Sequence, residues 1–283
     1  MEALFTRKSG TGKKTISKFK FGIPSFDRFL AGGLYQGTIT LMFEDSQSKH
    51  HYSFTRCFLG EGAQSKDQLF IYSSLCASNL IPPVGKMPKE STSKMRIAWR
   101  YTKQSQSEPD SSVYDLSKSL NYPCVHSNPS PSSLYTQIYE DISSSLSGID
   151  DTKPRRIYIR LNLSQWENKE LNIFWASLRC LLRSLNAVCL VSVNPSFAND
   201  MATLISENNA DLVLAVEDFE DKNPFVGFSA MLKIRKNARL TTLGNYDIAN
   251  NILGVVRDNK FLSVENLSLP PADSMSGSKA IDY

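Results

Sequence analysis

The chain has 283 residues, of which 41% are hydrophobic and 21% are charged, and its formal net charge is +4. This composition is that of an ordinary globular protein, and the length suits one α/β domain with a large core or two small domains. With no signal-peptide pattern and no apolar run of about 18 residues, we expect neither a secreted nor a membrane-spanning protein. The five cysteines and three histidines lack metal-ligand spacing, so no zinc site is predicted.

The positive charge is concentrated in residues 1–20, which hold six basic side chains and one glutamate, whereas the remainder of the chain is close to neutral. We expect these residues to form a flexible basic tail. Such a tail attracts polyanions by releasing their counterions. A solvated terminus without a partner explains the same charge, and the sequence leaves both interpretations open.

Residues 21–45 predict a short amphipathic helix, a glycine turn at Gly32 and Gly33, and a buried strand in which Ile39, Leu41 and Phe43 alternate with their neighbours. The further elements alternate between helix and strand, which is typical of parallel βαβ units. Helices are predicted at 48–60 (ended by its glycines), 132–146, 171–185 and 201–206, and order restarts at 114–117, where Asp115 or Ser117 can cap a short helix. Strands are predicted at 68–73, 95–101, 156–161, 188–193, 210–216, 228–236, 240–246 and 252–256.

Loops and termini complete the predicted organisation. Residues 77–94 are expected to form a surface loop and 102–112 a mobile polar segment, because both are rich in polar side chains. Residues 269–283 are expected to form a disordered C-terminal tail. The sequence therefore predicts one α/β domain at 21–268, with a mainly parallel central sheet flanked by helices.

The order of helix, glycine turn and strand in 21–45 resembles the start of a RecA-like ATPase, in which a phosphate loop follows the first strand. A phosphate loop needs two glycines, a lysine and a hydroxyl in the pattern G-x-x-x-x-G-K-[ST]. In that register Glu44 and Lys49 occupy the glycine positions and His50 the lysine position. The strand at 156–161 ends in Asn162, where such an ATPase has an acidic residue. We therefore expect a RecA-like domain with a degenerate phosphate loop that binds no nucleotide by its own motif and is not itself an enzyme.

Several segments support a more specific resemblance. They occur in the order GIPSFDRFLAGGLYQGTITLMFED, MRIAWRYTKQ, YDLSKSL, SLRCLLRSLNAVCLVSVNPSF, ADLVLAVEDF and FSAMLKIRKNARLTTLGNY. Together, over residues 20–248, they resemble the family of fourth subunits of the Elongator complex, and the pairing of MRIAWRY with YDLS is the most specific part. The chain departs from the family mainly in its short leading tail and short loops at 77–94 and 102–113.

The resemblance implies a non-catalytic structural and regulatory subunit of cytoplasm and nucleus, not attached to a membrane. It implies a hetero-hexameric RecA-like ring with Elongator subunits five and six, associated with the catalytic subunits one to three. The ring of that family binds tRNA and supports modification of wobble uridine at C5. Whether ATP binds at the subunit interfaces is left open.

Lys233 and Arg235 form a K-x-R sequence on a predicted late strand. It resembles the K-x-R of circadian-clock RecA-like hexamers, which reaches the nucleotide of the neighbouring subunit and supplies charge in trans. Alternation along a strand places both cations on one face. An ordinary exposed polar face of an edge strand gives the same pattern, and this interpretation also stays open.

Candidate tRNA contacts are Lys103, Lys169 and the basic tail, since phosphate contacts require only cations. Arg96 and Arg100 are further candidates, although beside Trp99 and Tyr101 they can equally stack within a protein interface.

Two other functions are weighed against the Elongator subunit. One is a self-sufficient RecA-like ATPase acting on DNA, which Glu44, Lys49, His50 and Asn162 disfavour. The other is a degenerate recombinase-paralogue adaptor, which the pairing of MRIAWRY with YDLS disfavours.

Overall fold

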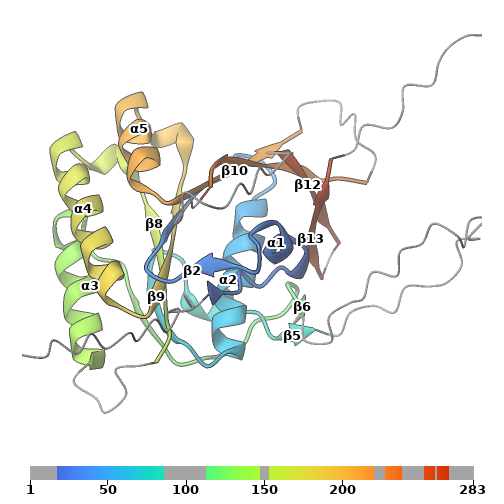
Figure 1. Ribbon diagram of the computed structural model, residues 1–283, viewed down its shortest axis with the longest axis horizontal. Helices are drawn as coiled ribbons and strands as arrows, with labels where there is room; N and C mark the ends of the chain where they lie inside the picture. Colours follow the sequence, from blue (N-terminus) through green and yellow to red (C-terminus); the bar gives the residue numbers. More distant parts are fainter. Residues whose placement is uncertain are drawn as a thin grey trace, which may run out of the picture.

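The computed structural model describes residues 18–85, 113–146, 153–219, 227–237, 252–258 and 260–267. In this part of the chain a nine-stranded sheet is covered by helices on both faces (Figure 1). The helices are α1 (Pro24–Phe29), α2 (His50–Gln64), α3 (Pro131–Leu146), α4 (Asn168–Ser184) and α5 (Asp200–Asn209). Single 3-10 turns are η1 (Ala77–Asn79), η2 (Leu163–Gln165) and η3 (Pro195–Phe197).

The sheet is parallel over six neighbouring strands and antiparallel at one end. Across the sheet the order is β13 (Leu262–Asn266), β12 (Ile252–Arg257), β11 (Ala230–Lys236), β10 (Leu212–Asp218), β3 (Ile39–Phe43), β9 (Ala187–Val193), β8 (Arg155–Leu161), β4 (Gln68–Tyr72) and β7 (Cys124–Ser127). Strands β10 to β7 run parallel, and β11, β12 and β13 are antiparallel. The prediction of a mainly parallel sheet between helices is therefore confirmed. Two small pairs join β1 (Lys18–Phe19) to β2 (Leu34–Tyr35), and β5 (Val84–Gly85) to β6 (Val113–Tyr114).

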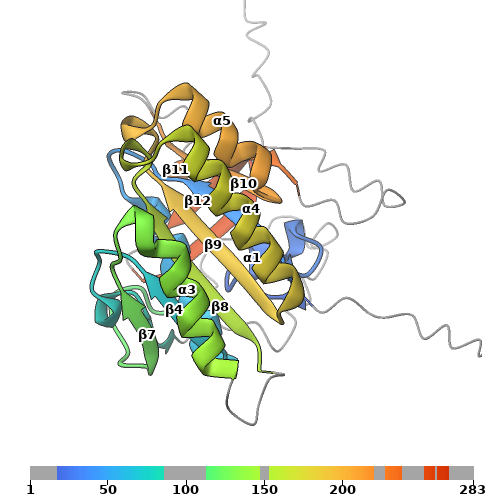
Figure 2. The ribbon, with the colours of Figure 1, turned by 90° about the vertical axis from the view of Figure 1, so that its left-hand side faces the viewer.

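Strand β3 is the centre of the parallel part, and all five of its residues are buried. Ile39, Leu41 and Phe43 pack under α3, α4 and α5, whereas Met42 faces the core beneath α1 and α2. Figure 2 shows α3, α4 and α5 side by side over their face of the sheet. Because ligands of open parallel sheets bind outside the carboxyl ends of the strands, the segment after β3 is the first place to look for a site.

Helix α2 is longer than the sequence predicts, and its glycines do not end it. It continues through Gly60 and Gly62 to Gln64. A Cβ atom on Gly62 would lie 2.6 Å from both Arg156 Cδ and Leu69 Cδ2. These glycines are therefore explained by the close approach of other elements to the helix.

Other boundaries also differ from the predictions. Lys18–Phe19 lies in the predicted tail but pairs with β2, so the folded part includes residue 18. Asp115 caps no helix; its carboxylate accepts from the Ser117 amide at 3.0 Å in a turn. Strand β13 was not predicted, and the supposed surface loop at 77–94 contains a buried Leu80. The predictions for 1–17, 95–101, 102–112, 240–246 and 269–283 lie outside the described residues.

We expect Gly62→Ala to lower the free energy of unfolding by about 1–3 kcal/mol, because the added methyl overpacks a site that cannot relax. Arg156 cannot move away, since its guanidinium is bonded to Asp67 and to the carbonyl of Phe58. An alanine replacing glycine in an open helix would instead stabilise the fold. Urea unfolding of the variant gives the value.

The control for Gly62→Ala is Thr136→Ala on the exposed face of α3, which adds helix propensity without a clash. An unchanged or raised stability of Gly62→Ala would mean that the close packing around α2 has been misjudged.

Candidate functional site

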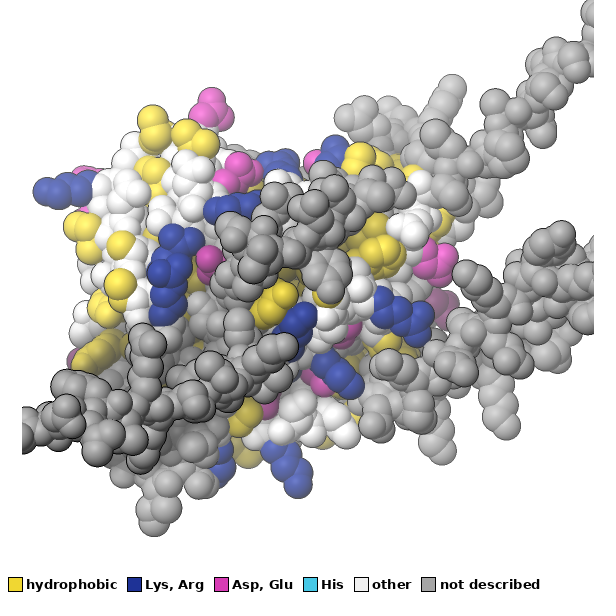
Figure 3. Space-filling model, viewed as in Figure 1, with side chains coloured by type: hydrophobic (Ala, Val, Ile, Leu, Met, Phe, Trp, Pro, Cys, Tyr) yellow, Lys and Arg dark blue, Asp and Glu magenta, His cyan; other side chains and the backbone are white. Residues whose placement is uncertain are grey.

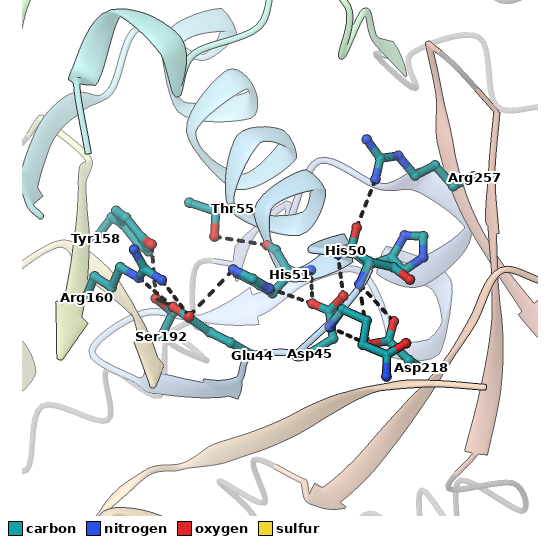
Figure 4. A network of polar contacts seen from close by, with 12 residues as sticks. Glu44, Asp45, His50, His51, Thr55, Tyr158, Arg160, Ser192, Asp218 and Arg257 are labelled. Atoms are coloured by element: carbon teal, nitrogen blue, oxygen red, sulfur yellow. Dashed lines mark hydrogen bonds and ion pairs between the residues drawn. The ribbon is translucent and has the colours of Figure 1, made fainter. Parts of the chain in front are cut away.

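The loop at 44–49 joins β3 to α2 at the carboxyl edge of the sheet, where a RecA-like ATPase carries its phosphate loop (Figure 4). Lys49, at the position of the second glycine, has a left-handed backbone with φ of +53°. A lysine adopts this conformation at a cost, because its Cβ crowds the backbone. The loop thus makes a glycine-type turn without a glycine.

Asp45 places a carboxylate at the start of α2. One of its oxygens accepts from the His50 amide at 2.6 Å, and the other accepts from the His51 amide at 2.9 Å. His51 Nδ1 lies 2.5 Å from the same carboxylate. Burial alone would raise the pKa of Asp45, but these hydrogen bonds outweigh it and hold the pKa at about 2. The carboxylate is therefore ionised and occupies the helix terminus, where anions are normally bound.

A second carboxylate approaches the loop from the end of β10. Asp218 accepts from the amide of Gln47 at 2.8 Å and from the amide of Ser48 at 3.3 Å. The backbone N–H groups of residues 47, 48, 50 and 51 are therefore all bonded to side chains of the same chain. These are the groups that a phosphate loop directs at phosphate oxygens.

Glu44 is buried on the opposite side of the loop and is held by β8 and β9. Arg160 donates Nε and Nη2 to its two oxygens at 2.8 Å each, and Ser192 Oγ donates at 2.9 Å. Burial would raise the pKa of Glu44, but the hydrogen bond and charge of Arg160 outweigh that effect and lower it. The same hydrogen bond raises the pKa of Arg160. Arg160 and Glu44 therefore form a bidentate ion pair with charge-assisted hydrogen bonds, which are stronger than hydrogen bonds between neutral groups.

The remaining positions of the motif also lack the charge that nucleotide chemistry requires. His50 stands where the phosphate-binding lysine belongs, and burial lowers its pKa, so the ring is neutral at neutral pH. Asn162 at the end of β8 accepts from the Ser164 amide at 3.2 Å and caps η2.

The structure places Lys233 and Arg235 on one face of β11, as the alternation predicts. Lys233 Nζ lies 2.5 Å from Glu217, and Arg235 Nη1 lies 2.8 Å from Glu207. The Arg235 guanidinium also lies over the Phe43 ring, 5.0 Å from its centroid. Both side chains stay partly exposed while they form ion pairs within the chain.

Of the predicted tRNA contacts, Lys169 and two lysines of the basic tail, Lys18 and Lys20, belong to the described residues. Lys18 Nζ donates to the Ala31 carbonyl at 2.6 Å. Lys169 is the candidate outside the tail. It is exposed in the first turn of α4, shortly after the carboxyl end of β8. Lys103, Arg96 and Arg100 lie outside the described residues. On the face seen in Figure 3 the basic side chains alternate with acidic and apolar ones, so the described residues there form no large basic patch.

Sequence reasoning missed the roles of Asp218 and Arg160, and it predicted the negative charge of Asp45 at the loop but not its bonds to the loop amides. Each stands at or near the carboxyl end of a predicted parallel strand, and such ends meet at one edge of a sheet. That rule identifies candidates, but the pairing of Asp218 with residues 170 positions earlier depends on the strand order. Within the described residues no cluster of His, Cys, Asp or Glu suits a metal, and no helix is long and apolar enough to cross a membrane.

The fold is RecA-like. A KaiC-like protein of the archaeon Pyrococcus horikoshii superimposes with a TM-score of 0.52 and 14% identity, covering 88% of this chain and 99% of that one. The chain belongs to the PAXNEB family, whose model matches residues 5–282.

Relatives named Elongator complex protein 4 share 24% identity in Dictyostelium discoideum, 26% in Xenopus laevis and 24% in Homo sapiens. Each alignment covers 92% of this chain, and 76%, 82% and 79% of the respective relative. The predicted resemblance to fourth subunits of Elongator is therefore confirmed.

We expect Asp45→Asn to lower the free energy of unfolding by about 2 kcal/mol at neutral pH, because the ionised carboxylate binds two backbone amides and His51. The pKa of about 2 in the folded state lies below the usual value of about 3.9 in the unfolded chain. This stabilisation is therefore complete above pH of about 4 and is lost as the pH falls through about 2.

Urea unfolding between pH 7 and the lowest pH at which the chain folds should show the difference between wild type and Asp45→Asn shrinking with acidity. Asp200→Asn, at the exposed start of α5, is the matched control. A difference that is absent, or that grows with acidity, would contradict the role given to the Asp45 carboxylate.

Proposed function

We propose that this chain is a non-catalytic structural and regulatory subunit of the Elongator complex. In this proposal it forms a hetero-hexameric RecA-like ring with subunits five and six, which works with the catalytic subunits one to three in cytoplasm and nucleus. The ring binds tRNA and supports the C5 modification of wobble uridine. The family membership of the chain and the names of its relatives support this assignment.

One observation carries the non-catalytic part of the proposal. The amides that would hold a triphosphate are bonded to Asp45 and Asp218. To bind ATP there, the phosphates would have to displace the carboxylates of Asp45 and Asp218. They would then lie close to a third carboxylate, that of Glu44. Like charges at such short range repel strongly in a partly buried site. The subunit therefore uses the RecA-like fold as a scaffold and binds no nucleotide by its own loop.

Nucleotide at the subunit interfaces remains part of the proposal. Lys233 and Arg235 would act on the nucleotide of a neighbouring subunit, and both are partly exposed, which such a role requires. Their ion pairs with Glu217 and Glu207 are worth little at an exposed surface, so assembly can replace them. Contacts with tRNA are assigned to Lys169, Lys103, Arg96 and Arg100, of which Lys169 is exposed near the carboxyl edge.

The purified chain alone should neither bind Mg-ATP in titration calorimetry nor hydrolyse it above background. The reason is that its loop amides are already bonded and that the neutral His50 occupies the position of the phosphate-binding lysine. The ring reconstituted with subunits five and six, assayed with the same ATP, is the positive control. Saturable binding and turnover by the lone chain would favour the self-sufficient ATPase instead.

In the reconstituted ring, Arg235→Ala should reduce ATP turnover at least about tenfold, since an arginine acting in trans stabilises transition-state charge. Ring mass, measured by light scattering, should not change. Arg28→Ala, which removes an exposed arginine from α1, serves as the control. Unchanged turnover in an intact ring would leave Arg235 with only its pairing inside the subunit.

Affinity purification from the native cell tests the assignment to the complex. Recovery of the five other Elongator subunits is expected. Recovery of recombination proteins in their place would favour the adaptor function and contradict the proposal.

A further inference from the structure

A cleft of about 350 Å³ opens at the carboxyl ends of β4, β8 and β9, beside the start of α3. Its described lining includes no residue of the loop at 44–49, so the cleft is a separate site. Its volume falls in the range of small-molecule sites, about 300–1,000 Å³. Its place at the carboxyl edge is where ligands of open parallel sheets bind.

Two asparagines that follow neighbouring strands line this cleft. Asn162 follows β8, and its Oδ1 accepts from the Ser164 amide. Asn194 follows β9, and its Oδ1 accepts from the Ser196 amide at 2.9 Å. Because both oxygens are used in these caps, each side chain leaves its NH₂ group for another partner. Within the described residues neither NH₂ group has one.

Arg160 adds a cation to the same wall. Its Nε and Nη2 are bonded to Glu44, which fixes the guanidinium plane, and Nη1 has no partner in the described part of the chain (Figure 4). The described lining contains no acidic side chain, and the first turn of α3 contains none either. One wall of the cleft therefore offers hydrogen-bond donors, one of them on a guanidinium whose charge is paired with Glu44, and such donors suit an oxyanion.

The other wall is apolar. It is formed by Pro129, Pro131 and Leu134 at the start of α3 and by Trp166 after η2. The Trp166 ring is held against Phe174, with centroids 5.0 Å apart. A planar ring can pack on such a surface, as bases do on aromatic side chains of nucleic-acid-binding proteins.

From these two walls we propose that the cleft binds a single nucleotide, through its phosphate and its base. The phosphate oxygens accept from the NH₂ groups of Asn162 and Asn194 and from Arg160 Nη1, and the base packs against Trp166 and the prolines. The nucleotide is either a free monophosphate or one unit of a single-stranded RNA. This site depends neither on ring assembly nor on the interface nucleotide of the proposed function.

The test measures binding of adenosine monophosphate, uridine monophosphate, a short single-stranded RNA and inorganic phosphate to the full chain by titration calorimetry. Asn162→Asp and Asn194→Asp keep the oxygen that caps the next turn but replace the donor with a charge that repels phosphate. Each should weaken nucleotide binding at least about tenfold and leave the thermal midpoint unchanged. Asn172→Asp, on the exposed face of α4, is the matched control and should bind as wild type does.

Binding of a monophosphate identifies a small-molecule ligand, and binding of the RNA alone identifies a strand; either result supports the site if both cleft variants weaken it. The proposal is overturned if neither nucleotide nor RNA binds at millimolar concentration, or if the cleft variants bind as the control does. Inorganic phosphate binding as tightly as the nucleotides would overturn the role of the apolar wall.

Discussion

The bonding of Asp45 and Asp218 to the loop after β3 is the interaction on which the rest of this structure depends. Four backbone amides at a turn and a helix start find acceptors here, and those of the buried His50 and His51 need them because buried unpaired N–H groups are costly. In an ATPase of this fold a phosphate supplies them when it binds. Here two carboxylates supply them permanently, so the loop keeps its shape without a ligand.

The same contacts connect the strands on both sides of β3. Asp218 belongs to β10, and Glu44 is held by Arg160 of β8 and Ser192 of β9. Breaking the buried ion pair between Glu44 and Arg160 would leave an uncompensated charge, which is costly. This cost holds the strands that carry the two side chains in place. A chain stabilised in this way needs no nucleotide to order the carboxyl edge of its sheet, which agrees with the proposed scaffold role.

Long-range packing also decides features that local rules misjudge. Glycine in a sequence usually signals the end of a helix, yet Gly60 and Gly62 lie inside α2 because Tyr114 and Arg156 approach too closely for a side chain. Likewise, Asn162 and Asn194 appear as unremarkable polar residues after two strands. They line one cleft only because β8 and β9 are neighbours in the sheet.

The sequence by itself determined the α/β class, most of the helices and strands and the likeness to Elongator fourth subunits, because hydrophobic periodicity and motif spacing are local properties. It also identified the missing glycines and lysine at Glu44, Lys49 and His50. Only the tertiary structure decided which groups take the place of phosphate, since Asp218 is 171 residues from Gln47. Strand order brings these residues together, and strand order is fixed by burial of the whole sheet, which no single segment encodes.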